Sequence, residues 1–277
     1  MTQRINVFIT VKTYPTLSEK YVETVCTAGI TESGHWIRIY PVPFRMLEEE
    51  GQYHKYQWLS LPLVRNDGKD FRPESYRVVS TDDIVLGQDV KNWDERRQLI
   101  FHKSAPIFHN MDDLIAQAKD EQILLSLATF KPQRILDFVI EPAESNWSQD
   151  KLDKLAAKSR QQTLFQTPEE IKKEFRIVRK VPYDFSYRFT DETGKERKLK
   201  ILDWEIGALY WNCLRASNGD QAIAVEKVRQ KYFDVFVQEK DVYLFVGTTL
   251  AWHKRAPNPF VIIGVFYPPF QHQQSLF

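Results

Sequence analysis

The sequence predicts an α+β fold with a small β-rich, barrel-like N-terminal module, a helical bridge and a C-terminal α+β domain. The early part contains short alternating segments separated by turn residues, which is typical of a small barrel or a strongly bent sheet. The middle part has longer segments with apolar residues at helical spacing. The last part alternates a hairpin, helices and strands. The expected boundaries are 1–90, 91–165 and 166–277.

Composition excludes several classes of protein. The chain has 277 residues, 43% of them hydrophobic and 27% charged, as expected for a soluble globular protein of one or two domains. Lys and Arg total 38 against 37 Asp and Glu, so any nucleic-acid affinity has to come from a local patch. Only two cysteines, Cys26 and Cys213, are present, which excludes a disulfide framework and a cysteine-rich zinc site. No segment has the length of a membrane span or a signal-peptide core, so we expect a cytoplasmic protein without a membrane partner.

Alternation and turn residues place the N-terminal elements. Strands are predicted at 5–11, 21–30, 36–40, 56–64 and 78–79. Gly29 and the turn at 31–34 separate the second and third strands, so we expect these two strands to form a hairpin. The residues 46–50 are expected to form a short helical turn.

Helix-capping residues and apolar spacing place the later elements. Asn110, Ser148, Asp203 and Asp220 are suited to begin helices, because their side chains can accept hydrogen bonds from the first turn. Helices are predicted at 92–101, 110–127, 149–162, 203–217 and 220–236, and strands at 134–140, 175–181, 185–189, 197–202, 242–246 and 260–267. The tail, 271–277, is expected to be disordered or lightly docked.

The predicted strand at 36–40 carries the most informative pattern. Side chains alternate across a strand, so Trp36, Arg38 and Tyr40 share one face and Ile37 and Ile39 share the other. The aliphatic pair is suited to the core, whereas a guanidinium between two aromatic rings can stack on planar or anionic ligands. Alternatively, these three side chains cover one another on an exposed strand and have no further role.

A basic and aromatic set surrounds this strand in the N-terminal module. Cations that reach phosphates, together with rings that stack on bases, are the minimum needed to bind a nucleic-acid strand or a flipped base. We expect the arginines to contact phosphates and Trp36 or Tyr40 to stack on bases, provided that folding separates this set from nearby glutamates. The predicted nucleic-acid-binding residues are Lys12, Tyr14, Trp36, Arg38, Tyr40, Arg45, Arg72 and Arg77.

A second candidate site lies at a predicted hairpin. Asp184 precedes this hairpin, and Glu196 and Lys198 project from one face of its return strand. This arrangement resembles the motif of the restriction-endonuclease superfamily. Such a set would hold Mg²⁺ and place an ammonium beside a phosphate, and Mg²⁺ is the only cofactor that any of our hypotheses requires. Alternatively, these residues are solvated charges beside a turn.

A third candidate site lies where a predicted strand meets a helix. Asp203 and Glu205 are carboxylates at this junction, and Thr248 and His253 follow another predicted strand. If the two strand ends are neighbours, the four side chains would surround one pocket. Alternatively, Asp203 caps the helix and Glu205 lies in its first turn, which is ordinary helix-start chemistry. The histidines lack metal-ligand spacing, so no metal site is predicted here.

Several segments together resemble a group of uncharacterised bacterial proteins. The resemblance covers both ends of the chain and implies that it is one unit, but it brings no activity with it. The residues that carry it are Lys-Thr-Tyr-Pro at 12–15, Trp-Ile-Arg-Ile-Tyr-Pro-Val-Pro-Phe-Arg at 36–45, Arg-Pro-Glu-Ser-Tyr-Arg at 72–77, Asp-Trp-Glu at 203–205, Phe-Val-Gly at 245–247 and Tyr-Pro-Pro at 267–269.

The leading hypothesis is a bacterial nucleic-acid-binding protein, with DNA or RNA as its partner. Recognition of foreign or modified DNA, as in antiviral defence, would be one use of it. The first alternative is a hydrolase that acts on nucleic acid, either a metal-dependent nuclease or a base-excising glycosylase, and uses carboxylates among Asp184, Glu196, Asp203 and Glu205. The second alternative is a protein-interaction subunit without nucleic-acid contact. The sequence does not define an oligomeric state.

Overall fold

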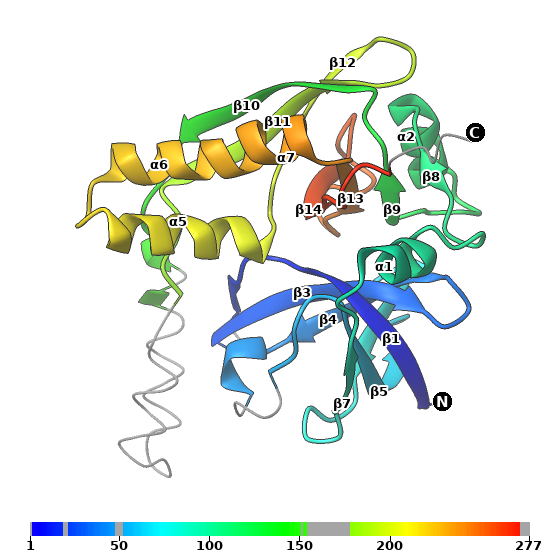
Figure 1. Cartoon of the computed structure of the whole chain (residues 1–277). Helices are drawn as coiled ribbons and strands as arrows, with labels where there is room; N and C mark the ends of the chain where they lie inside the picture. The colour runs from blue at the N-terminus through cyan, green and yellow to red at the C-terminus, as the bar shows by residue number, and fades with distance from the viewer. Residues whose placement is uncertain (1, 19–21, 48–51, 151, 154–177, 272–277) are drawn as a thin grey trace.

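Three sheets and a helical layer make up the molecule (Figure 1). The computed structural model describes residues 2–18, 22–47, 52–150, 152–153 and 178–271. The predicted α+β class, with a barrel-like N-terminal module and a C-terminal α+β region, is confirmed. Among the described helices, none combines the length and the apolar character needed to cross a membrane.

The N-terminal sheet closes on itself. Its strands are β1 (Gln3–Lys12), β2 (Thr16–Ser18), β3 (Val22–Thr31), β4 (Trp36–Val42), β5 (Gln57–Arg65), β6 (Ser75–Val78) and β7 (Val85–Asp89). The order is β1-β3-β4-β6-β5-β7, and β1 also pairs with β5, which completes a ring of strands. The 3-10 helix η1 (Phe44–Met46) follows β4. Buried aliphatic side chains such as Val7, Ile37 and Leu61 fill the interior of the ring, as alternation predicts.

Asparagine caps start both helices of the middle region. The side chain of Asn92 accepts hydrogen bonds from the first turn of α1 (Trp93–Ile100), and Asn110 does the same for α2 (Met111–Lys119). The predicted helix 110–127 is therefore too long. The side chain of Asp120 accepts from Gln122 N, Leu124 has φ of 50°, and the chain then enters the strand β9 (Leu127–Phe130). Every residue of β9 is buried, so its apolar run belongs to a central strand.

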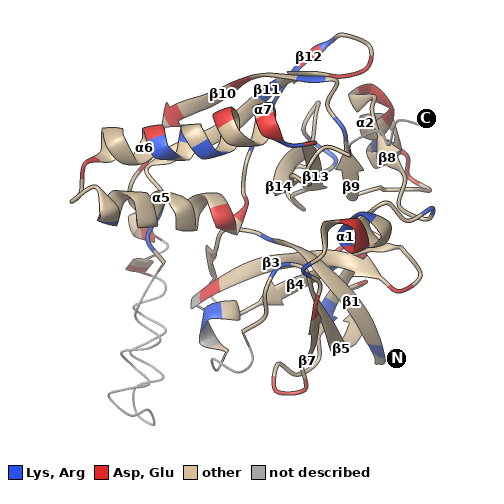
Figure 2. Ribbon diagram, in the orientation of Figure 1, with Lys and Arg blue, Asp and Glu red and all other residues tan. Residues whose placement is uncertain are grey.

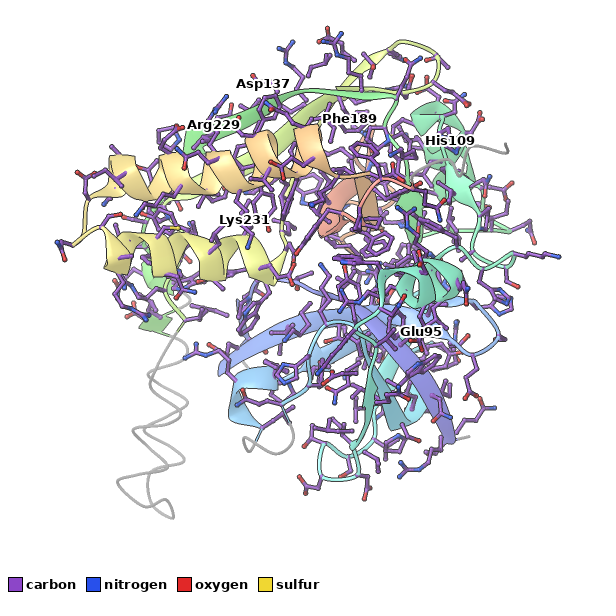
Figure 3. All side chains as sticks on the ribbon, viewed as in Figure 1. Glu95, His109, Asp137, Phe189, Arg229 and Lys231 are labelled. Atoms are coloured by element: carbon purple, nitrogen blue, oxygen red, sulfur yellow. The ribbon has the colours of Figure 1, made fainter. Side chains whose placement is uncertain are left out.

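Two sheets form the C-terminal region. One has the order β14-β13-β9-β8, and the other has the order β10-β11-β12. Their other strands are β8 (Ile107–Phe108), β10 (Arg134–Pro142), β11 (Tyr183–Thr190), β12 (Glu196–Lys200), β13 (Tyr243–Thr248) and β14 (Phe260–Phe266). Phe189 of β11, labelled in Figure 3, contacts the ring of Phe130 in β9 with 5.5 Å between ring centroids. This contact joins the two sheets.

A helical layer covers one face of β10 and β11 (Figure 1). It consists of α5 (Trp204–Ala216), α6 (Gln221–Arg229), the π-helical segment η3 (Gln230–Val235) and α7 (Phe236–Glu239). Buried rings of Tyr187, Tyr210 and Tyr232 lie between the layers, and the Tyr187 hydroxyl donates to Tyr232 O at 2.5 Å. The predicted helix at 149–162 lies mainly outside the described residues, as do residues 48–50 of the predicted helical turn and the tail beyond 271. The predicted strand at 175–181 is described only over 178–181, and these residues are not in a strand, since β11 begins at Tyr183.

The N-terminal and C-terminal regions are joined by backbone pairing. Tyr14 N donates to Leu202 O at 2.8 Å, and Thr13 forms an antiparallel bridge with Asp203. The segment that follows β1 therefore pairs with the segment between β12 and α5. This pairing brings the Lys-Thr-Tyr-Pro stretch next to the Asp-Trp-Glu stretch.

Charges of both signs are interspersed on the surface. Figure 2 shows Lys and Arg together with Asp and Glu along α6 and over the hairpin of β11 and β12. Lys198 pairs with Glu141 at 2.7 Å, and Lys200 pairs with Asp184 at 2.6 Å. These two strands therefore carry paired charges, in line with the net charge of +1.

Candidate functional site

A cavity of about 510 Å³ lies where the N-terminal and C-terminal regions meet. Its walls come from the segment that follows β1, from β4, from β11 and β12, from the start of α5 and from the loop after β13. Its volume is within the range of about 300–1,000 Å³ that small-molecule sites occupy. The aromatic rings in its wall are Tyr14, Tyr40, Trp147, Tyr183 and Phe185, and its charged residues are Arg38, Arg72, Lys180, Asp184, Lys200 and Asp203.

Arg38 and Arg72 lie in the cavity wall as buried residues, each with 3% of its surface exposed. Arg38 Nη1 donates to Thr248 O at 2.9 Å, and its Nη2 donates to Ser126 O at 2.9 Å. Arg72 Nη1 donates to the same Thr248 carbonyl at 2.5 Å. The expectation of an open strand face around Arg38 therefore needs correction. The last residue of β13 and the residue before β9 accept hydrogen bonds from this guanidinium, so this face of β4 is buried against the C-terminal region.

Asp70 fixes the second arginine. Its two oxygens accept from Arg72 Nε at 2.8 Å and Arg72 Nη2 at 2.5 Å, and Ser75 Oγ donates to it at 2.7 Å. Burial alone would raise the pKa of the Asp70 carboxyl, but these hydrogen bonds outweigh burial and lower it to about 2. Arg72 is thus held by a carboxylate on one side and a carbonyl on the other.

Asp203 and Lys55 form a buried ion pair beside the cavity. Lys55 Nζ lies 3.7 Å from Asp203 Oδ2, donates to Glu205 Oε2 at 2.9 Å and donates to Val265 O at 3.1 Å. Burial raises the pKa of Asp203 to about 6, although Lys55 opposes this effect. Burial would also raise the pKa of Glu205, but Lys55 and then Lys231, labelled in Figure 3 between α5 and α6, hold it below its ordinary value. Asp203 is thus a carboxyl group in the cavity wall whose pKa burial has moved toward neutral pH.

Lys12 lies in an aromatic cage and outside the cavity wall. Its ammonium is 4.2 Å from the ring centroid of Phe44 and 5.5 Å from that of Trp204, and it donates to Tyr53 O at 3.1 Å. Burial lowers the pKa of Lys12 to about 8, and the nearby carboxylates limit the fall. Lys12 was predicted to be a nucleic-acid-binding residue, and its ammonium instead makes contacts within the protein.

The other predicted binding residues are divided. Tyr40, 36% exposed, and Tyr14 line the cavity. Trp36 packs edge-on against Phe245, with 5.4 Å between centroids, and is not part of the wall. Arg45 pairs with the buried Glu23 at 2.8 Å. Arg77 is exposed on β6, also away from the wall.

The structure does not bring the nuclease set together. Glu196 pairs with Thr190 in register, whereas Asp184 lies six residues away on the same strand β11, a separation of roughly 20 Å at 3.3 Å per residue. Glu196 instead pairs with Arg188 at 3.2 Å. In the described part of the chain, no three His, Cys, Asp or Glu side chains are grouped so as to hold a metal ion.

The strand ends at Asp203 and Thr248 are neighbours, as the third hypothesis required. Both residues line the cavity, whereas Glu205 and His253 do not. His253 is buried: its Nε2 donates to Ala118 O at 2.8 Å, so its Nδ1 accepts from Thr248 Oγ1 at 2.7 Å. This imidazole is a neutral structural group that fixes the loop after β13.

Several wall residues were not predicted. Trp147, Tyr183 and Phe185 were not among the predicted site residues, although the last two flank the candidate Asp184, and Lys180 was not among them either. Lys55 was missed too, since its hydrogen-bond acceptors Glu205 and Val265 lie 150 and 210 residues further along the chain. The spacing of charged or aromatic residues within one segment does not identify these residues, because the cavity is formed by segments that are far apart in the sequence.

Comparisons with known proteins give family matches. A family model described as a domain of unknown function, DUF8757, matches residues 107–277, and a model described as a domain of unknown function, DUF8758, matches residues 3–102. No curated protein matches the chain. A solved structure entitled "Structure of murine DNA binding protein bound with ds DNA" aligns over 99% of this chain and 99% of its own, with 7% identity and a TM-score of 0.29.

Proposed function

We propose that this chain, which belongs to the DUF8757 family of domains of unknown function, binds nucleic acid and takes one unstacked base into its cavity. The observation that carries the proposal is a cavity of about 510 Å³ with five aromatic rings in its wall. Every base has a π-face, and stacking of bases on aromatic side chains is the common mode of binding to unpaired strands.

Buried polar atoms in the wall support a ligand with polar edges. Arg38 Nε and Thr249 Oγ1 are buried and have no hydrogen-bond partner among the described residues. A buried donor without a partner costs about 1–3 kcal/mol. The edges of a base carry both acceptors and donors, so a bound base would satisfy these atoms.

Two lysines in the cavity wall favour a ligand that carries a phosphate next to the base. Lys180 pairs with Glu144, whose side chain is 86% exposed, and Lys200 pairs with the partly exposed Asp184. Exposed ion pairs contribute about 0–1 kcal/mol, so a phosphate can replace these partners at little cost. Binding would then weaken as salt rises.

The test is fluorescence anisotropy with labelled single- and double-stranded DNA and RNA over a salt series. We expect binding to single strands that weakens with salt. Ala251→Trp puts a bulky side chain at an exposed turn residue of the cavity wall, where it would occupy the space that the base needs. It should weaken binding about 5- to 150-fold, the contribution of one stacked base. Val85→Trp, at a position that is 54% exposed on β7 and not in the cavity wall, is the matched control and should bind like the wild type.

Two results would contradict the proposal. Equal binding by Ala251→Trp and Val85→Trp would place the site elsewhere. Absence of binding to every probe at low salt would remove nucleic acid as the partner and leave the protein-interaction alternative, with other proteins as the partners to search for.

A second candidate function, base excision, is favoured by Asp203. This carboxylate lies in the wall of the same cavity, and burial raises its pKa to about 6. In such a reaction water attacks C1′ of the sugar, the C1′–N bond breaks, and its electron pair leaves with the base. Asp203 would take the proton from the water and pass it to the base.

Base excision is tested with oligonucleotides that carry uracil, hypoxanthine or alkylated purines, followed by alkali and a gel. We expect alkali-labile sites with the wild type in the absence of metal, and none with Asp203→Asn, which keeps the size of the side chain. Asp137→Asn on β10, labelled in Figure 3, is the control and should retain full activity. Equal cleavage by both variants, or no cleavage by the wild type, would show that Asp203 does not catalyse the excision of these bases.

A further inference from the structure

The loop after β13 presents an aromatic and basic surface at the edge of the cavity. Trp252 is 60% exposed, more than any other large hydrophobic residue in the described part of the chain. Leu250 and Ala251, immediately before it, line the cavity. Lys254 and Arg255, immediately after it, are exposed. We name residues 250–255 the Trp252 loop.

The Trp252 loop is held firmly at its base. His253 is fully buried and bonds to Thr248 and to Ala118, which belong to β13 and α2. Backbone hydrogen bonds run from Trp252 N and His253 N to Thr249 O, at 3.2 and 3.0 Å, and from Ala256 N to Trp252 O at 2.9 Å. An exposed indole on an anchored turn loses little conformational freedom when it binds a partner.

The charges on the Trp252 loop indicate the chemistry of the partner that it would bind. Lys254 Nζ lies 4.7 Å from the ring centroid of Phe71, itself 38% exposed, and neither Lys254 nor Arg255 forms an ion pair with a described acidic residue. Glu74, the acid that influences His253 nearby, accepts from Ser126 N and Ser126 Oγ. Two cations and two exposed rings next to a cavity suited to a base favour a polyanion with stacked rings, which is nucleic acid.

We infer that Trp252 stacks into the nucleic acid beside the base held in the cavity, filling the space that this base leaves in the duplex. The inference rests on the proposed function. Moving a base out of a duplex costs stacking free energy. An apolar or aromatic side chain inserted at the vacated base step offsets part of that cost. Lys254 and Arg255 would hold the flanking phosphates. The loop thereby specifies a duplex with an unpaired or extruded nucleotide as the preferred ligand.

The experiment compares three labelled DNA probes by anisotropy: a single strand, a paired duplex, and a duplex with one central unpaired adenine. We expect Trp252→Ala to weaken binding to the bulged duplex about 5- to 150-fold while single-strand binding changes little. Trp252→Phe should bind the bulged duplex nearly as the wild type does. Ile223→Ala, at a 48% exposed apolar position on α6, is the control for loss of surface.

Charge variants give an independent measurement. Replacing Lys254 and Arg255 together with glutamine should reduce the slope of log K against log salt by about 2, because two phosphate contacts are lost. An unchanged slope would show that the two cations do not reach phosphate.

Each remaining outcome separates the inference from the proposed function. If the wild type binds and Trp252→Ala binds all probes equally well, the inference is wrong and the proposed function stands. If Trp252→Ala weakens single-strand and bulged-duplex binding alike, Trp252 is part of a strand track and not a wedge. If the wild type binds no probe, both proposals fail.

Discussion

Arg38→Met should lower the free energy of unfolding by about 2–4 kcal/mol. The side chain is 3% exposed, and its guanidinium donates to Thr248 O and Ser126 O, both in the C-terminal region. Methionine fills a similar volume but removes both hydrogen bonds, and a hydrogen bond from a charged donor contributes about 1.5–3 kcal/mol. The two carbonyl groups keep one donor each, because Arg72 Nη1 still donates to Thr248 O and Thr248 N to Ser126 O. Part of the loss is offset because a buried cation no longer has to be desolvated.

Urea denaturation measures this loss, with Arg77→Met as the control. Arg77 is exposed on β6, so its replacement should change the free energy of unfolding by less than about 0.5 kcal/mol. If the two variants are equally stable, Arg38 does not join the two regions, and the contacts between β1 and 202–203 would have to do so alone.

Lys55→Met should be more destabilising still at pH 8, by about 3–5 kcal/mol, because it leaves two carboxylates without their cation. The Lys55 side chain is 7% exposed and lies between Asp203 and Glu205. Burial would lower the pKa of Lys55, but these two carboxylates hold it well above its ordinary value. Lys198→Met removes an exposed lysine from a surface pair with Glu141 and should cost at most about 1 kcal/mol.

The loss in Lys55→Met should depend on pH. Asp203 has a raised pKa of about 6, so its protonated form is favoured by the fold, and this contribution to stability is lost as pH rises from about 4 through 6. Without Lys55 the pKa of Asp203 rises further, and the penalty for ionising it grows at neutral and higher pH. We therefore expect a smaller difference between the variant and the wild type at pH 5 than at pH 8. A difference that stays constant with pH would exclude Asp203 as the cause.

Much of the fold could be predicted because its signals are local. The caps at Asn110, Asp203 and Asp220 accept from backbone N–H groups two or three residues further on, so the sequence alone places the helix starts. Alternation placed β1, β4 and β5 because one face of each strand fills the ring. The expectation of an uncharacterised family is also confirmed by the matches to domains of unknown function.

The geometry of the site depends on tertiary packing. Three residues singled out from the sequence, Tyr14, Tyr40 and Asp203, line the cavity, and what they bind stays a prediction. Arg38 was expected on an open face because alternation assigns a side chain to a face and gives no information on what covers that face. Its acceptors lie 88 and 210 residues further along the chain. Pairings over such distances follow from tertiary packing and have no counterpart in local spacing.

The bonds from Arg38 and Arg72 end on the same backbone oxygen, the carbonyl of Thr248. A carbonyl group is present whatever side chain its residue carries. Substitutions at position 248 therefore leave this connection in place, although most of them remove the hydroxyl that donates to His253, whereas each arginine must persist as an arginine. At this contact the N-terminal region is constrained in its side chains and the C-terminal region in the path of its backbone.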